Sequence, residues 1–139
     1  MFFSKIKTSM EKEIYEQPSI IKGIIEKEKV DEIGVPSNVN KIVLVASGSS
    51  YHCARFSSEL LGEIAGLEAR AIYSSEFLLK KVVPHDKGTL YIFITQSGET
   101  TDTIKALRRV NEGFSSGEDK YYLDTMCITN KENSTIWKE

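Results

Sequence analysis

Two short segments of the sequence carry side chains that could bind an anion. The first covers residues 46–50 (Ala-Ser-Gly-Ser-Ser), and the second covers residues 95–100 (Thr-Gln-Ser-Gly-Glu-Thr). Each follows a run of β-branched and apolar residues and precedes a helical pattern. Backbone N–H groups at the start of a helix have no partner within the helix, and the helix dipole favours negative charge there. The two segments therefore predict a site for a small phosphorylated molecule at one edge of a sheet.

The second segment offers neutral hydrogen-bond donors for such a phosphate. They are three hydroxyl groups and one amide, from Thr95, Gln96, Ser97 and Thr100. The segment does not contain the lysine that reaches the phosphates in a nucleotide P-loop, so a sugar or small metabolite is favoured over a magnesium-bound triphosphate. The carboxylate of Glu99 would repel a phosphate, and we expect it to turn away.

A second interpretation of these segments needs no ligand, because serine and threonine also cap helices. The presence of two hydroxyl-rich segments at equivalent places favours the phosphate site. His52 and Cys53 follow the first segment directly, but adjacent residues on a helix point about 100° apart and do not converge on one atom. We therefore expect Cys53 to be a buried thiol, and we predict no catalytic residue, no metal site and no cofactor.

The length, composition and charge of the chain fit one globular domain. The chain has 139 residues, of which 40% are hydrophobic and 27% are charged. Its formal net charge of −2 gives no indication of nucleic-acid binding. No apolar run approaches the about 20 residues that cross a bilayer, and the two cysteines form neither a disulfide framework nor a metal-ligand pattern. We expect a soluble, cytoplasmic protein without nucleic-acid or membrane partners.

Four apolar runs alternate with helical patterns along the rest of the chain. They predict strands at residues 41–46, 68–73, 89–95 and 123–129. Continuous apolar runs indicate strands buried on both faces, and their alternation with helices indicates parallel strands joined by right-handed crossovers. We therefore predict an open α/β sheet covered by helices. Ligands bind such sheets at the carboxyl ends of the strands, where both hydroxyl-rich segments lie.

Local patterns predict how the connecting segments fold. The helix at residues 51–65 is expected to stop at Gly66 and to turn an apolar face inward. The residues expected on that face are Phe56, Leu60, Leu61 and Ile64. A short helix begins at residues 74–77, where serine is suited to cap it. Residues 113–120 are predicted to form a polar surface loop.

Residues 1–36 are predicted to form a helical segment that precedes a sheet domain of residues 37–139. Apolar residues recur at helical spacing between residues 4 and 29. Pro18 lacks a backbone N–H and clashes with the preceding turn, so we expect a break or a kink there, and a second helix can start at the proline. We expect the apolar face of this segment to pack on the outside of the domain or on a partner.

Several motifs together indicate a known family. They run in family order along nearly the whole chain, at residues 12–18, 46–51, 65–66, 75–77, 96–100, 102–103 and 127–130. They resemble sugar isomerase (SIS) domains, and in particular the isomerase half of glucosamine-6-phosphate synthase, the isomerising glutamine–fructose-6-phosphate aminotransferase. The segment Lys-Glu-Ile-Tyr-Glu-Gln-Pro at residues 12–18 is specific to the synthase among SIS proteins.

The resemblance implies a flavodoxin-like, doubly wound parallel sheet that binds fructose 6-phosphate or glucosamine 6-phosphate. It implies that Ser49 lies near the sugar. The residues implied to bind the phosphate are Ser50, Thr95, Gln96, Ser97 and Thr100. The family usually has cysteine and threonine where Ser47 and Ser49 stand, and serine where Thr95 stands. A hydroxyl group therefore remains at each binding position, and phosphate binding is expected to persist.

The resemblance also implies which parts of the synthase lie outside this stretch. The synthase has an amino-terminal glutaminase domain and two SIS domains, and its catalytic glutamate, histidine and lysine lie beyond the matched residues. Family SIS sheets have five parallel strands, whereas four are predicted here. We therefore expect a SIS domain that is incomplete on its carboxy-terminal side and that binds the sugar phosphate without catalysing the reaction alone.

Two alternative functions remain open. In the first, the chain is one part of a split or assembled isomerising aminotransferase that is active only with partner chains, as a homo-oligomer or paired with another SIS chain. In the second, it is a non-catalytic structural or regulatory remnant.

Overall fold

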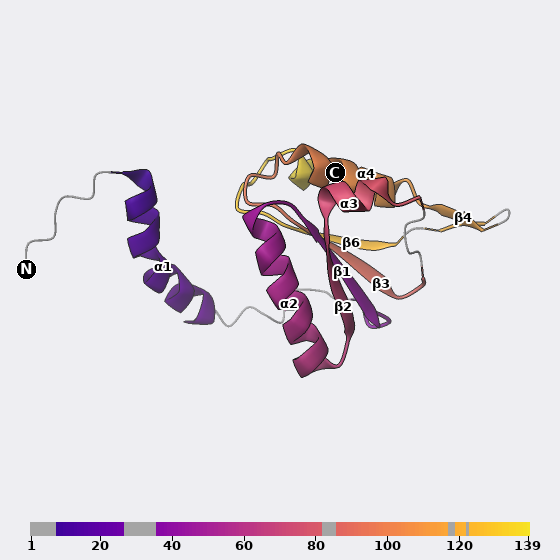
Figure 1. Ribbon diagram of the computed structural model, residues 1–139, viewed down its shortest axis with the longest axis horizontal. Helices are drawn as coiled ribbons and strands as arrows, with labels where there is room; N and C mark the ends of the chain where they lie inside the picture. Colours follow the sequence, from indigo (N-terminus) through magenta and orange to yellow (C-terminus); the bar gives the residue numbers. More distant parts are fainter. Residues whose placement is uncertain (1–7, 27–35, 82–85, 117–118, 122) are drawn as a thin grey trace, which may run out of the picture. The chain divides into compact units, whose positions relative to one another are not determined.

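The computed structural model describes residues 8–26, 36–81, 86–116, 119–121 and 123–139. The chain divides into two compact units, residues 1–35 and residues 36–139, which are considered separately. The second unit contains an α/β sheet and both hydroxyl-rich segments (Figure 1). Among the described helices, none is long and apolar enough to cross a membrane.

The predicted parallel sheet is confirmed, with its four strands nearly as expected. They are β1 (Lys41–Ala46), β2 (Glu68–Tyr73), β3 (Thr89–Ile94) and β6 (Asp124–Ile128), in the order β2-β1-β3-β6. All neighbouring strands are parallel, and Val43 in the centre pairs with Arg70 on one side and Tyr91 on the other. The chain winds from β1 outward to β2 and then returns to β3 on the opposite side. The strand order therefore reverses between β1 and β3, which is where such sheets bind ligands.

Helices cover both faces of the sheet, and two apolar cores result. The face with Val43, Tyr91 and Phe93 packs under α3 (Ser74–Leu79) and α4 (Thr101–Asn111). The opposite face packs against α2 (Ser49–Ala65) around Ala54 (Figure 1). The strands are thus buried on both sides, as their continuous apolar runs predicted.

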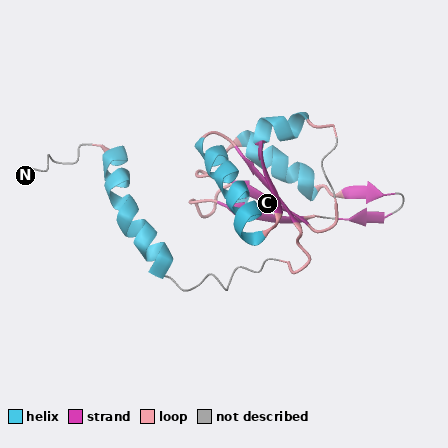
Figure 2. Cartoon of the chain, turned by 60° about the horizontal axis from the view of Figure 1, so that its bottom comes forward, coloured by secondary structure: helices cyan, strands magenta, loops and turns pink. Residues whose placement is uncertain are grey.

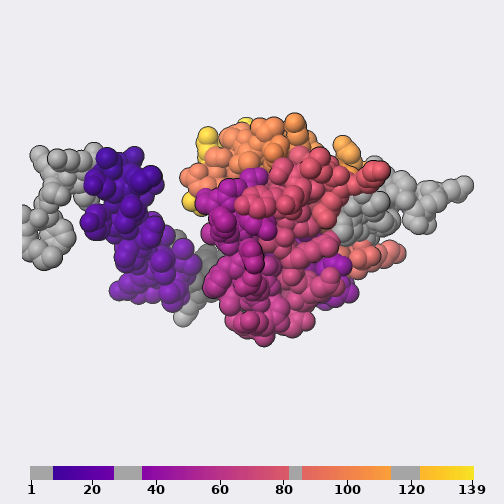
Figure 3. All heavy atoms as spheres, viewed as in Figure 1, coloured from indigo at the N-terminus to yellow at the C-terminus, as the bar shows by residue number. Residues whose placement is uncertain are grey.

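The inward face of α2 differs from the predicted one. Ala54 and Ser58 are buried against the sheet, whereas Phe56 is 64% exposed and Ile64 is 80% exposed. Leu60 is also exposed, and of the four predicted residues only Leu61 packs against the core. Positions two residues apart lie about 200° apart on a helix, so burial of the small residues turns the large ones outward. Figure 3 shows α2 in purple and magenta on the visible surface.

The end of α2 is as predicted, but two other local predictions are wrong. Gly66 ends the helix in the left-handed conformation, with φ of 64°. Ser74 does not cap α3; it is buried, and its Oγ lies 2.9 Å from Thr103 Oγ1 on α4. Strands β4 (Phe114–Ser116) and β5 (Asp119–Tyr121) pair antiparallel where a loop was expected (Figure 2). This pairing satisfies backbone groups that a loop would leave to water.

The helix of the first unit, α1 (Ser9–Glu26), is continuous through Pro18, so the predicted break is wrong. A reciprocal pair of hydrogen bonds between Thr8 and Glu11 caps its start. Pro18 has no N–H to donate to the helix. Next to it, Ser19 Oγ donates a hydrogen bond to the Glu16 carbonyl at 2.8 Å. The predicted helical stretch also included residues 4–7 and 27–29, which fall outside the described residues.

Candidate functional site

The carboxyl ends of three adjacent strands meet around one pocket of about 260 Å³. It lies where the strand order reverses, and each of the segments that follow β1, β3 and β6 contributes to it. The lining residues are Ser49, Ser50, Cys53, Ile94, Thr95, Gln96, Ile128, Thr129 and Asn130. The pocket is therefore lined by neutral polar residues and by the apolar ends of β3 and β6.

The first segment places the start of α2 at the pocket. Gly48 adopts φ of 57°, which favours glycine, and the Tyr51 N–H donates to its carbonyl at 3.1 Å. Ser49 and Ser50 form the first turn of the helix, and both line the pocket. Tyr51 packs outside the pocket, with its ring stacked 3.6 Å from that of Tyr73. The first turn of α2 thus presents two hydroxyl groups and its backbone N–H groups toward one place.

The second segment is folded around the side chain of Thr95. Thr95 is buried, and its Oγ1 lies 3.0 Å from Thr100 Oγ1 and accepts the Gly98 N–H at 3.3 Å. Ser97 Oγ accepts the Glu99 N–H at 3.2 Å. These bonds form a compact turn between β3 and α4, with Thr95 at its base.

The helix-capping interpretation does not account for these hydroxyl groups. The residue before α2 is Gly48, which has no side chain to cap with. The residue before α4 is Thr100, which makes no capping hydrogen bond because its hydroxyl is directed to Thr95. The first N–H groups of α2 and α4 are therefore without a side-chain cap, and those of α2 lie at the pocket.

The structure brings together four of the six residues predicted to bind the sugar phosphate. Ser49, Ser50, Thr95 and Gln96 all line the pocket. The other two, Ser97 and Thr100, lie in the turn after β3 but are not among the lining residues, and their binding role stays a prediction.

Sequence reasoning missed three polar residues of the pocket. Cys53 is exposed rather than buried, because it lies one helical turn after Ser49 on the same side of α2. Thr129 and Asn130 follow β6 as the other two segments follow their strands. The rule that ligands meet the carboxyl ends of parallel strands could have identified both.

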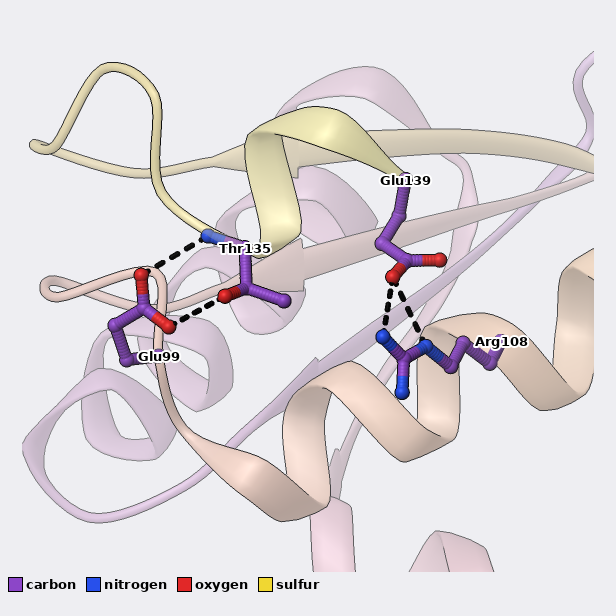
Figure 4. A network of polar contacts seen from close by, with 4 residues as sticks. All are labelled: Glu99, Arg108, Thr135 and Glu139. Carbon is purple, nitrogen blue, oxygen red and sulfur yellow. Dashed lines mark hydrogen bonds and ion pairs between the residues drawn. The ribbon is translucent and has the colours of Figure 1, made fainter.

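Glu99 is held outside the lining of the pocket. Its carboxylate accepts hydrogen bonds from the backbone N–H and the hydroxyl of Thr135, at 3.0 and 2.6 Å (Figure 4). These bonds, together with the charges of Lys131 and Lys138, lower the pKa of the Glu99 carboxyl below its usual range. Glu99 is thus ionised at neutral pH, and its carboxylate is hydrogen-bonded to Thr135 rather than lining the pocket.

The electrostatics of the pocket come from uncharged groups and from the helix that begins there. None of its lining residues is charged, and the described residues contain no group of three or more acidic, histidine or cysteine side chains placed to hold a metal ion. Attraction for an anion comes from the N-terminus of α2 and from neutral donors.

The chain is similar to proteins of known function. The sequence-family model of the SIS domain matches residues 37–139 of the chain. The isomerising glutamine–fructose-6-phosphate aminotransferase of Campylobacter jejuni is 38% identical over 135 residues, which cover 91% of this chain and 21% of that protein. The same enzyme of Methanothermobacter thermautotrophicus is 39% identical over 107 residues, covering 73% of this chain and 18% of that protein. The chain thus spans about a fifth of the length of these relatives.

Solved structures show the same likeness. The C-terminal domain of glucosamine-fructose-6-phosphate aminotransferase from Francisella tularensis superposes with a TM-score of 0.76 at 31% identity, over 99% of this chain and 39% of that one. A glucosamine-6-phosphate deaminase from Thermotoga maritima shares the fold, with a TM-score of 0.72 at 21% identity, over 95% of this chain and 38% of that one. The predicted resemblance to the isomerase half of the synthase is confirmed, and the chain belongs to the SIS-domain family.

Proposed function

We propose that this chain binds a sugar phosphate in the pocket at the β1/β3 switch point. The observation that carries the proposal is the meeting of hydroxyl-rich segments with an uncapped helix start at one edge of the sheet. Neutral hydroxyl and N–H donors can surround the oxygens of a phosphate while the helix dipole compensates its charge. The volume of about 260 Å³ lies below the range of about 300–1,000 Å³ that is typical of drug-sized ligands, which suits a small metabolite.

In this proposal the phosphate lies against the first turn of α2 and the turn after β3. Its proposed ligands are Ser50, Thr95, Gln96, Ser97 and Thr100, and Ser49 is proposed to lie near the sugar. Thr129 and Asn130 lie on the other side of the pocket, where their side chains can meet the sugar hydroxyls. Ile94 and Ile128, at the ends of β3 and β6, add apolar surface to the lining.

Fructose 6-phosphate and glucosamine 6-phosphate are the ligands we propose. The support comes from the relatives, which are named for fructose 6-phosphate and are more than 30% identical to this chain. Since the chain spans about a fifth of those proteins, amino transfer and isomerisation are proposed only for an assembly that supplies further residues.

Calorimetric titration of the chain tests the binding function. Both sugar phosphates are expected to bind saturably at millimolar concentration or below, inorganic phosphate to compete with them, and fructose to show no binding. A Ser50→Ala variant should bind more weakly, whereas Ser57→Ala, further along the same helix and outside the pocket, should bind as the wild type does. Absence of saturable binding by the wild type would refute the proposal.

We further propose that the chain acts with a second SIS domain, from its own copy or from another chain. Strand β6 has a strand neighbour on one side only within the described residues, and its last residue, Ile128, is half exposed. An uncovered edge of this kind offers backbone groups for pairing. Light scattering should show a dimer, or a complex with an added SIS chain, and isomerase activity is expected only in the complex; a monomer under both conditions would contradict this proposal.

A further inference from the structure

The C-terminal segment, residues 129–139, holds the turn after β3 at successive points. The Asn130 N–H donates to Gln96 O at 3.3 Å, and the Ile136 N–H donates to Gly98 O at 3.1 Å. Between these two bonds, Thr135 binds the Glu99 carboxylate through both its N–H and its hydroxyl (Figure 4). The turn that carries Thr95 and Gln96 is therefore built against a segment that lies more than 30 residues later in the chain.

The packing between the two segments leaves little freedom. A Cβ atom at Gly98 would lie 2.1 Å from Ser134 Oγ and 2.4 Å from Ser134 Cβ. Ser134 is itself buried, and its hydroxyl donates to Lys131 O at 2.8 Å. The position of the C-terminal segment thus fixes where the backbone of the turn runs.

Glu99 gives this contact an electrostatic consequence. It is the one charged residue of the segment 95–100, three residues after the lining residue Gln96. An ionised carboxylate so close to an anion site weakens binding unless something keeps it away. Thr135 satisfies both carboxylate oxygens, and Lys131 and Lys138 add favourable charge on the same side.

We propose that Thr135 is a positioning residue that holds the Glu99 carboxylate away from the phosphate site, so that the affinity for a phosphorylated ligand depends on this contact. The inference rests on the proposed binding function. Loss of the Thr135 hydroxyl removes one of the two hydrogen bonds that hold the carboxylate and leaves only the bond from the backbone N–H. The carboxylate can then rotate toward the pocket more readily and repel the bound phosphate. Removal of the Glu99 charge abolishes that repulsion.

Four variants of the chain test this inference by calorimetric titration with fructose 6-phosphate. Thr135→Val is expected to weaken binding by about threefold to tenfold, the size of one partly screened charge interaction. Glu99→Gln is expected to bind nearly as the wild type does, and the double variant Glu99→Gln/Thr135→Val should return to the level of Glu99→Gln. Thr135→Ser, which keeps the hydroxyl, should restore wild-type affinity. Thr135→Ala replaces the valine variant if that variant does not fold.

Glu139→Gln is the matched control. Glu139 accepts a hydrogen bond from Arg108 Nε at 2.9 Å and anchors the far end of the same segment to α4 (Figure 4). The substitution removes the ionic part of this contact without freeing Glu99, so ligand affinity should stay unchanged.

Titrations at several ionic strengths distinguish electrostatic repulsion by Glu99 from a loosening of the C-terminal segment. The ratio of the wild-type and Thr135→Val affinities should shrink as salt is added, because screening weakens repulsion. Wild-type affinity in Thr135→Val, or a double variant as weak as Thr135→Val, would overturn the inference while the binding function stands. A wild-type chain that binds no sugar phosphate would instead refute the proposed function.

Discussion

Replacement of Gly98 by alanine should destabilise the sheet domain strongly, and more than the same change at Gly66. Two effects add at this position. Gly98 has φ of 69°, a left-handed conformation that costs a residue with a side chain about 1–2 kcal/mol. The added Cβ would also lie 2.4 Å from Ser134 Cβ, which is fixed to the backbone and cannot rotate away. Overpacking of this kind costs about 1–3 kcal/mol. The sum is a loss of about 2–5 kcal/mol.

Gly66→Ala is the matched control for this change. Gly66 has nearly the same backbone conformation, with φ of 64°, but nothing lies within 4 Å of the position of its missing Cβ. Its replacement should cost only the conformational contribution of about 1–2 kcal/mol. The effect of alanine on the unfolded chain is the same in both variants and cancels in the comparison.

Urea denaturation of the wild type and both variants, followed by circular dichroism, measures the difference. The free energy of unfolding should fall further in Gly98→Ala than in Gly66→Ala, by about 1–3 kcal/mol. Ser134→Gly in the Gly98→Ala background removes the clashing atoms and should recover part of that difference. Equal losses in Gly98→Ala and Gly66→Ala would refute the close approach between the turn and the C-terminal segment.

Three further predictions concern buried hydroxyls, thiols and acid stability. Ser74→Ala should lower the free energy of unfolding by about 1–3 kcal/mol, because the buried Thr103 hydroxyl loses its partner; adding Thr103→Val should recover much of this loss in urea denaturation. Iodoacetamide should modify the exposed Cys53 faster than Cys127, whose pKa is raised by burial, and fructose 6-phosphate should slow only the Cys53 reaction in mass spectrometry; equal protection of both thiols would contradict the assignment of the pocket. Because the pKa of Glu99 is lowered in the folded protein, its ionised carboxylate stabilises the fold at pH values above the reference pKa of 4.5, and this stability is lost as the pH falls through the lower, folded-state pKa. Glu99→Gln should therefore flatten the fall of the melting temperature with decreasing pH on the acid side.

The sequence was sufficient to predict the sheet because its strands are marked by continuous apolar runs. Helices cover both faces of the strands Lys41–Ala46 and Thr89–Ile94, so neither strand shows an alternation of apolar and polar residues. The site followed from the same rule, since segments after parallel strands meet at one edge. Ser49 and Thr95 lie in these segments and line the pocket, while their role in binding stays a prediction.

The errors arose where tertiary contacts decide the outcome. The helical pattern of α2 contains two possible faces, and the sheet selects the smaller side chain of Ala54 over that of Phe56 because the helix packs closely on β1 and β2. Ser74 has the residue type of a helix cap, but a partner 29 positions away takes its hydroxyl. The position of Cys53 in the pocket likewise depends on the rotation of α2 about its axis. Local patterns carry no information about such partners.

The distance along the chain between the turn after β3 and its supporting contacts matters during synthesis. Glu99 and Thr135 are 36 residues apart, so at about 5–20 residues per second the turn leaves the ribosome roughly 2–7 s before its hydrogen-bond partners do. During that interval β1, β2 and β3 can already pair, while the pocket still lacks the lining residues Ile128, Thr129 and Asn130. The binding competence of a nascent chain should therefore arise abruptly, once the residues beyond β6 have emerged.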